Sequence, residues 1–177
     1  MTKKRSNGFN TWSPGLPMRV LSLPGLLILA MLSGILSLTY IYRQKMNIVK
    51  LFGIDLYKLL IELGFHFRQA QFITAQSAHE TANFTSAIFQ KNNNLFGMKQ
   101  AGQRLSLGEK NGYASYRTIE DSVKDFQTYY RLNNYLKIYS DIESYSQTLK
   151  NKKYFEAPLL EYQKGMKHFY NLYFGQT

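Results

Sequence analysis

Hydrophobic residues are distributed unevenly along the chain. From Val20 to Tyr42 no residue is charged, and this stretch has the length of a helix that crosses a hydrocarbon core, about 20 residues. A basic segment, residues 1–19, precedes it. The pattern predicts one transmembrane helix at residues 20–42.

A cleaved signal peptide is the alternative interpretation of this segment, because a basic start followed by an apolar stretch fits a signal peptide too. The apolar stretch is longer than a usual signal core, and it ends in LTYIYRQK, where cleavage requires small residues. We therefore expect an uncleaved, single-pass membrane anchor. A slight excess of basic residues before the stretch places the following domain on the periplasmic or extracellular side.

After a short basic linker at residues 43–53, apolar residues recur at spacings of three and four, as in amphipathic helices. Thr118 and Asp121 form a capping-box pattern at the beginning of one of these helices. A single domain, residues 54–177, is therefore expected. Its predicted helices are Asp55–Leu63, Arg68–Ala82, a helix that includes Ile119 to Tyr130, Asp141–Lys150, and a last helix from Leu159 to Tyr173.

The stretch Asn92–Tyr116 has a different character. Three consecutive Asn residues open it and four Gly residues are spaced through it, which is typical of loops and turns. We predict loops with one β-hairpin there, in a region that could form a cleft. The expected fold class is mainly α, that is α+β with a small β-hairpin region.

Composition excludes several kinds of site. The chain has no Cys, so disulfides, thiol nucleophiles and zinc-thiolate sites are excluded. His79 has no partner His or Asp at ligand spacing, and we predict no metal and no cofactor. The net charge is +11, of which +7 belongs to residues 43–177, and this charge suits an anionic partner. The basic residues form no dense run, so we predict no nucleic acid partner.

Glu80 is the main candidate for catalysis. It lies near the end of a predicted helix, in the otherwise uncharged stretch Gln69–Gln90. Apolar neighbours such as Phe84 and Ala87 would disfavour the ionised carboxylate and raise its pKa toward the range of a general acid. The structural alternative is a helix-end carboxylate bound to a nearby amide or Arg.

The surrounding stretch Ile73–Lys99 reads ITAQSAHETANFTSAIFQKNNNLFGMK. Together with a downstream helix, it resembles the glucosaminidase domain of glycoside hydrolase family 73, found in bacterial autolysins, flagellar muramidases and phage endolysins. The resemblance covers residues 56–174. The residues that match are Ala75, Gln76 and Glu80 of an AQxxxET helix, Asn93, Asn94, Leu95, Phe96, Gly97 and Lys99 of NNLFGxK, and Asp121, Ser122 and Asp125 of an SxxDSxxDY helix.

The resemblance implies a lysozyme-like, α-rich fold with an extended groove. It also implies cleavage of the β-1,4 bond between N-acetylglucosamine and N-acetylmuramic acid in peptidoglycan glycan strands, with Glu80 protonating the leaving oxygen. A second carboxylate, or the acetamide of the substrate, must then stabilise the oxocarbenium-like charge or activate water. Glu109 is the candidate for that carboxylate, and an exposed turn residue is the alternative interpretation of it.

Four further residues are predicted to bind the substrate. Tyr113 and Tyr116 could form the floor of the groove, because aromatic faces stack on sugar rings. They are three residues apart, so only one of them would face the groove from a regular strand, and Tyr116 is the preferred one. Asn94 and Phe96 are predicted to shape the wall of the cleft.

Two other functions compete with the hydrolase. A membrane-anchored, non-catalytic peptidoglycan-binding or scaffolding module would keep the fold and the groove without turnover, and the lack of a clear second carboxylate favours it. An amidase that cuts the peptide stem would need zinc with His ligands or a Cys nucleophile, and the sequence offers neither.

Overall fold

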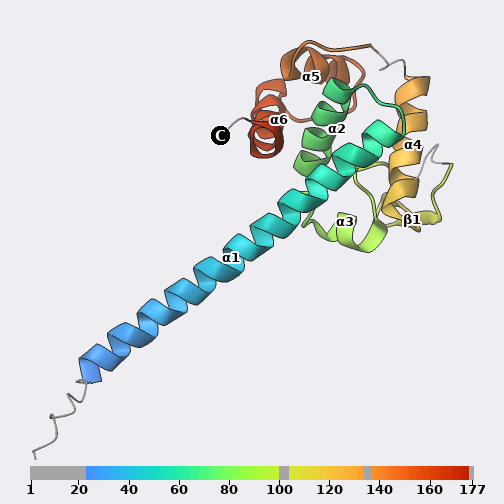
Figure 1. Ribbon diagram of the computed structural model, residues 1–177. Coiled ribbons are helices and arrows are strands. Elements are labelled where there is room, and N and C mark those ends of the chain that lie inside the picture. Colours follow the sequence, from blue (N-terminus) through green and yellow to red (C-terminus); the bar gives the residue numbers. More distant parts are fainter. Residues whose placement is uncertain (1–22, 100–103, 134–136, 176–177) are drawn as a thin grey trace, which may run out of the picture. The chain divides into compact units, whose positions relative to one another are not determined.

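The computed structural model describes residues 23–99, 104–133 and 137–175. The chain divides into two units, Met1–Tyr42 and Arg43–Thr177, and all elements after the first helix lie in the second unit (Figure 1). The elements are α1 (Leu23–Glu62), α2 (Phe67–Glu80), α3 (Ala87–Asn92), β1 (Gly108–Lys110), β2 (Tyr113–Ser115), α4 (Ile119–Leu132), α5 (Ile142–Asn151) and α6 (Leu159–Phe174).

The helix α1 differs from the prediction in its length. Residues 43–53, the predicted linker, are helical and belong to α1. The predicted helix Asp55–Leu63 is accordingly the last part of α1 and not a separate element. Residues 43–53 contain no proline, and Arg43, Gln44 and Lys45 are good helix formers, so the helix continues through the segment to Glu62.

The first part of α1 carries mostly apolar side chains. Nine large ones are more than half exposed: Ile28, Met31, Leu32, Ile35, Leu36, Leu38, Tyr40, Ile41 and Tyr42. Residues 20–22 of the predicted span lie outside the described residues, and among the described residues no helix is long and apolar enough to cross a membrane.

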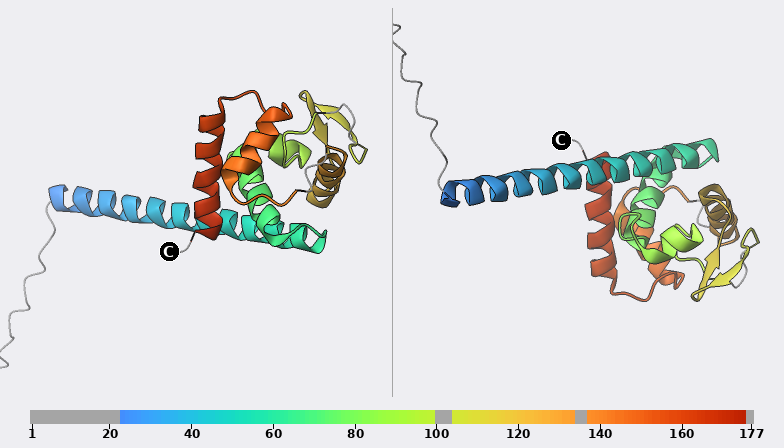
Figure 2. Two further views of the ribbon diagram at one scale, coloured as in Figure 1. Left: turned by 90° about the horizontal axis from the view of Figure 1, so that it is seen from above. Right: turned by 90° about the horizontal axis from the view of Figure 1, so that it is seen from below.

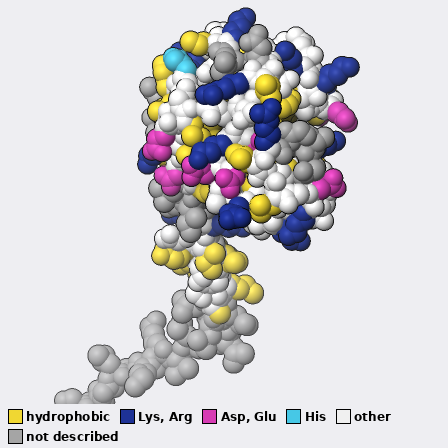
Figure 3. Space-filling view, turned by 90° about the vertical axis from the view of Figure 1, so that its right-hand side faces the viewer, with side chains coloured by type: hydrophobic (Ala, Val, Ile, Leu, Met, Phe, Trp, Pro, Cys, Tyr) yellow, Lys and Arg dark blue, Asp and Glu magenta, His cyan; other side chains and the backbone are white. Residues whose placement is uncertain are grey.

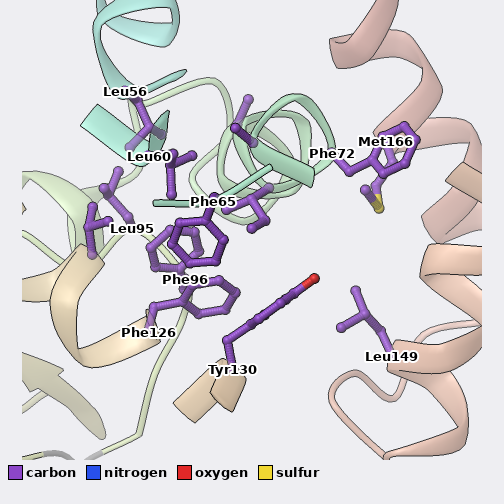
Figure 4. Close-up of a cluster of buried hydrophobic side chains, with 14 of the residues drawn as sticks. Leu56, Leu60, Phe65, Phe72, Leu95, Phe96, Phe126, Tyr130, Leu149 and Met166 are labelled. Carbon is purple, nitrogen blue, oxygen red and sulfur yellow. The ribbon is translucent and has the colours of Figure 1, made fainter. Parts of the chain in front are cut away.

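The core of the second unit surrounds α2, whose residues from Phe72 to Ala78 are all buried. The helix is enclosed because α6 packs along it, as the two views of Figure 2 show. Phe96 and Phe126 stack with their ring centroids 3.9 Å apart, and Tyr130 lies against Phe126 (Figure 4). The predicted mainly helical fold is confirmed, and α2, α4, α5 and α6 correspond to predicted helices.

The predicted β-hairpin is also confirmed. Strands β1 and β2 pair antiparallel, with Glu109 opposite Ala114. Asn111 and Gly112 connect them, with φ angles of 57° and 77°. Positive φ at both central residues is the requirement of a two-residue type I′ turn, and Asn-Gly is the sequence that meets it most easily. The buried Asn92 donates from Nδ2 to the carbonyl of Lys110 (2.8 Å), which fixes the hairpin to the end of α3.

A left-handed turn follows α2 directly. Ala82, Asn83 and Phe84 have φ angles of 49°, 58° and 61°, and each such residue other than Gly costs about 1–2 kcal/mol. The hydroxyl of Thr81 compensates, because it accepts a hydrogen bond from the Phe84 N–H (2.9 Å) and donates one to the Ser77 carbonyl (2.6 Å). The turn thereby ends α2 at Glu80, with Thr81 as the C-cap.

We expect Ala82→Gly to stabilise the protein, because Ala82 is exposed and its left-handed backbone suits glycine. The expected gain in the free energy of unfolding is about 1 kcal/mol, measured by urea denaturation. Ala87→Gly is the matched control, since Ala87 is exposed in the first turn of α3 and should lose about 0.5–1 kcal/mol. Equal effects at the two positions would contradict the strain at Ala82.

Candidate active site

Glu80 is the last residue of α2, and buried hydrogen bonds hold this end of the helix in place. The hydroxyl of Tyr145 donates to Oε1 of Gln76 (2.5 Å), and the hydroxyl of Ser77 donates to the carbonyl of Leu95 (3.0 Å). Gln76 is one helical turn before Glu80, so both lie on the same face of α2. The backbone that carries Glu80 is therefore tied to α5 and to the loop after α3.

The carboxyl group of Glu80 has one hydrogen-bond donor from the last helix. The hydroxyl of Tyr162 donates to Oε1 of Glu80 over 2.7 Å. Burial raises the pKa of Glu80 above its ordinary value, and the hydrogen bond from Tyr162 opposes part of that rise. Burial and the nearby Glu80 raise the pKa of Tyr162 well above its ordinary value, so its hydroxyl keeps its proton. Glu80 thus retains a proton to higher pH than an exposed Glu, as a general acid must.

Glu80 opens into a cavity of about 510 Å³. A Cβ atom placed at Gly97 would lie 3.6 Å from Oε2 of Glu80, so the NLFG segment runs directly beside the carboxyl group. Aromatic rings and polar side chains together suit a polar ring-shaped ligand such as a sugar. The lining consists of Glu80, Phe96, Gly97, Met98, Lys99, Tyr113, Tyr129, Lys153, Tyr154, Phe155 and Glu156.

Residues 153–156, in the loop between α5 and α6, form one wall of this cavity, and aromatic contacts hold this loop. The ring of Phe155 stacks on that of Tyr162, with centroids 3.7 Å apart and planes 5° from parallel. The hydroxyl of Tyr154 donates to the carbonyl of Phe96 (2.7 Å), which joins this wall to the opposite one. The ammonium group of Lys150 lies over the ring of Phe155, 5.2 Å from its centroid.

The structure reverses the preference between the two tyrosines of the hairpin region. Tyr113 lines the cavity, whereas Tyr116 is 2% exposed and donates from its hydroxyl to Oδ2 of Asp125 (3.1 Å). The choice of Tyr116 for the groove is therefore corrected. Tyr116 lies just beyond the end of β2, where strand alternation no longer decides which way a side chain points.

The other two predicted binding residues, Phe96 and Asn94, differ in whether they line the cavity. Phe96 lines the cavity. Asn94 does not line it, because its side chain is buried in the loop, where Nδ2 donates to the carbonyls of Met98 (2.8 Å) and Ala114 (2.9 Å). Asn94 thus joins the NLFG segment to β2 and supports the wall of the cavity without lining it.

The two predicted catalytic carboxylates lie in different surroundings. Glu80 lines the cavity, whereas Glu109 is exposed on β1 and is not among the lining residues that the structure describes. The second carboxylate of the lining is Glu156. Within the described parts of the chain, no group of three or more His, Cys, Asp or Glu could hold a metal ion.

Sequence reasoning missed Tyr162, Tyr154 and the loop residues around Glu156. The ring of Tyr162 is buried, and its hydroxyl reaches Glu80. A buried Tyr needs a partner for its hydroxyl, so a Tyr within the apolar stripe of the last helix was the available signal. The loop gave no signal, because its residues meet Glu80 only in the folded chain.

We expect Tyr162→Phe to change the pH dependence of activity. The hydrogen bond from Tyr162 favours ionised Glu80, so its loss should raise the pKa of Glu80 further. A general acid acts in its protonated form, and the alkaline limb of kcat/KM should therefore move to higher pH. Tyr170→Phe removes a hydroxyl from the same helix that contacts Gln71 instead and should leave the limb in place. An unchanged limb in Tyr162→Phe would contradict this coupling.

Comparison with known proteins identifies the family of this chain. Residues 65–173 match the family model "Glucosaminidase: Mannosyl-glycoprotein endo-beta-N-acetylglucosaminidase". The matched stretch includes Glu80 and every residue described as lining the cavity. Neither the curated proteins nor the solved structures gave a match. Because the matched residues make up more than half of the sequence, this chain belongs to the glucosaminidase family.

Proposed function

We propose that the domain is an endo-β-N-acetylglucosaminidase that hydrolyses the glycan strands of peptidoglycan, with Glu80 as the general acid. The observation that supports this most directly is the position of Glu80, half-buried in a cavity with aromatic walls, with a raised pKa and a fixed hydrogen-bond donor. Membership of the glucosaminidase family supports the same reaction type.

The proposed reaction begins with proton transfer. Protonated Glu80 gives its proton to the glycosidic oxygen while the bond to the anomeric carbon breaks, and the sugar passes through an oxocarbenium-like state. Glu80 is left ionised, and the hydroxyl of Tyr162, 2.7 Å from Oε1, stabilises that charge. The half-buried Tyr113 supplies a ring face on which a sugar can stack.

A second group must stabilise the developing positive charge or activate water. Glu156 is the candidate in the cavity, and the acetamide oxygen of the substrate itself is the alternative. Glu109 lies on the hairpin and is not among the described residues that line the cavity, so we rank it below these two. Substitution of each carboxylate by its amide separates the three possibilities, because an acetamide-assisted reaction survives both Glu156→Gln and Glu109→Gln.

The test is the identity of the bond that breaks. The full-length protein is incubated with purified peptidoglycan, and released fragments are reduced with borohydride and analysed by mass spectrometry. We expect fragments that end in reduced N-acetylglucosamine. Fragments that end in reduced N-acetylmuramic acid would contradict the proposed bond, and binding to cell walls without any release would favour the non-catalytic binding module.

We further propose that the protein is attached to a membrane, with the domain on the periplasmic or extracellular side. The support is the uncharged stretch 20–42 and the exposure of the apolar side chains from Ile28 to Tyr42, because exposed apolar surface of this extent is normally covered. Fractionation with alkaline carbonate tests this. We expect the protein in the membrane pellet, and complete release into the supernatant would contradict the proposal.

A further inference from the structure

We propose that Lys99 and Lys153 form a carboxylate-binding subsite that makes the enzyme select acidic glycan strands over neutral polymers of N-acetylglucosamine. This inference rests on the proposed glycosidase function and specifies its substrate class. The carboxylates concerned are those of the peptide stem or, on an N-acetylmuramic acid residue without a stem, its lactyl carboxylate, and neutral chitin-like strands lack both.

The two lysines reach the same cavity from distant parts of the chain. Lys99 follows the NLFG segment and Lys153 follows α5, and both line the cavity that contains Glu80. Lysine and arginine side chains are spread over the face of the domain in Figure 3, with acidic side chains between them. What distinguishes Lys99 and Lys153 is therefore their place in the lining of the cavity that contains Glu80, and not a dense basic patch on the surrounding surface.

The two lysines differ from their neighbours in their contacts with the described residues. Among the residues that the structure describes, none pairs with or accepts a hydrogen bond from the side chain of Lys99 or Lys153. The neighbouring lysines differ: Nζ of Lys152 donates to the carbonyl of Asn133 (2.9 Å), and Nζ of Lys150 donates to the carbonyls of Glu156 and Ala157 (both 2.8 Å). Two of the three lysines at the end of α5 stabilise the loop, and the third extends into the cavity.

The backbone of Lys153 gives a second, independent indication. Its φ angle is 58°, a conformation that glycine adopts readily and lysine rarely. Strained residues of this kind cluster at binding and catalytic sites. A lysine at a position that favours glycine, with its side chain lining the cavity, is explained by a role for its charge.

The charge balance of the cavity favours an anion. When Glu80 holds the proton that catalysis requires, the charged side chains of the described lining are Lys99 and Lys153 against Glu156. The excess positive charge therefore lies in the same cavity as Glu80. A carboxylate bound there makes charge-assisted hydrogen bonds, which are stronger than those of neutral groups.

The test compares two substrates that differ only in charge. The first is purified peptidoglycan strands, and the second is the same strands with their carboxyl groups converted to methylamides by carbodiimide and methylamine. We expect wild-type kcat/KM to be about tenfold higher on the acidic strands, as one charge-assisted contact warrants. In intact strands the lactyl carboxyl group forms the amide bond to the stem, so a preference for these strands comes from the stem carboxylates. Removal of the stems frees the lactyl carboxylate: a preference retained on the stripped strands shows that the subsite binds that group as well, and a lost preference assigns the subsite to the stem alone.

The variants are compared by one ratio, kcat/KM on the acidic strands divided by kcat/KM on the methylamide strands. Lys99→Gln and Lys153→Gln should each lower this ratio several-fold. Lys153→Arg keeps the positive charge and should keep the wild-type ratio, as should the control Lys152→Gln. Lys153→Gly separates loss of the charge from loss of stability, because it should lower the ratio and raise Tm. A wild-type ratio of one, or an unchanged ratio in both glutamine variants, would overturn the subsite. Absence of cleavage of both substrates by the wild type would instead refute the proposed function.

Discussion

Glu80→Gln should lower kcat on peptidoglycan by about two to four orders of magnitude, the usual contribution of a general acid. The amide has nearly the same shape as the carboxyl group and can still accept the hydrogen bond from Tyr162, but it has no acidic proton to give. The rate of appearance of new reducing ends measures this loss. Activity within tenfold of the wild type would remove Glu80 from the catalytic role.

The stability of the same variant separates catalysis from structure. Burial raises the pKa of Glu80 in the folded protein above the ordinary value of 4.5. A carboxyl group of this kind stabilises the fold at low pH, and that contribution is lost as the pH rises through the folded-state pKa. Gln lacks the titration, so at neutral pH the variant should be at least as stable as the wild type in urea. A less stable variant would indicate that Glu80 is chiefly a structural residue.

Phe126→Ala should give the largest loss of stability, about 3–5 kcal/mol. The side chain of Phe126 is 1% exposed, and it stacks on Phe96 and packs against Tyr130. Its removal leaves a void and releases Phe96, which lines the cavity that contains Glu80. Urea denaturation should show the loss. Activity should fall as well under conditions where the variant is still folded.

Leu132→Ala is the matched control, because Leu132 lies on the same helix with its side chain 70% exposed. Its effect on the free energy of unfolding should stay within about 0.5 kcal/mol. A comparable loss in both variants would mean that helix propensity, and not packing against Phe96, governs the stability of α4.

Sequence reasoning succeeded where one local rule governs the structure. The spacing of apolar residues predicts α2, α4, α5 and α6, and the capping box of Thr118 and Asp121 is present at the beginning of α4. It failed at residues 43–53, where basic residues suggested a linker. Basic side chains are good helix formers, and charge alone does not separate a linker from an exposed helix.

The residues of the candidate site also differ in whether a local feature of the sequence identifies them. Glu80 could be identified because a lone carboxylate in an apolar stretch is a local feature of the sequence. Tyr162 and Glu156 could not, because they reach the cavity only when α6 and the loop before it pack against α2. The hairpin tyrosines were assigned the wrong way round because Tyr116 lies outside the regular strand, beside Asp125.

The distance along the chain between Glu80 and Tyr162 has a consequence for biosynthesis. Glu80 leaves the ribosome long before Tyr162, which belongs to the last helix. A nascent chain that ends before α6 therefore contains the acid but lacks the hydroxyl that fixes it and the ring that Phe155 covers. The complete surroundings of Glu80 are assembled only after synthesis has nearly finished, so an unfinished or truncated chain contains Glu80 without the contacts that set its pKa.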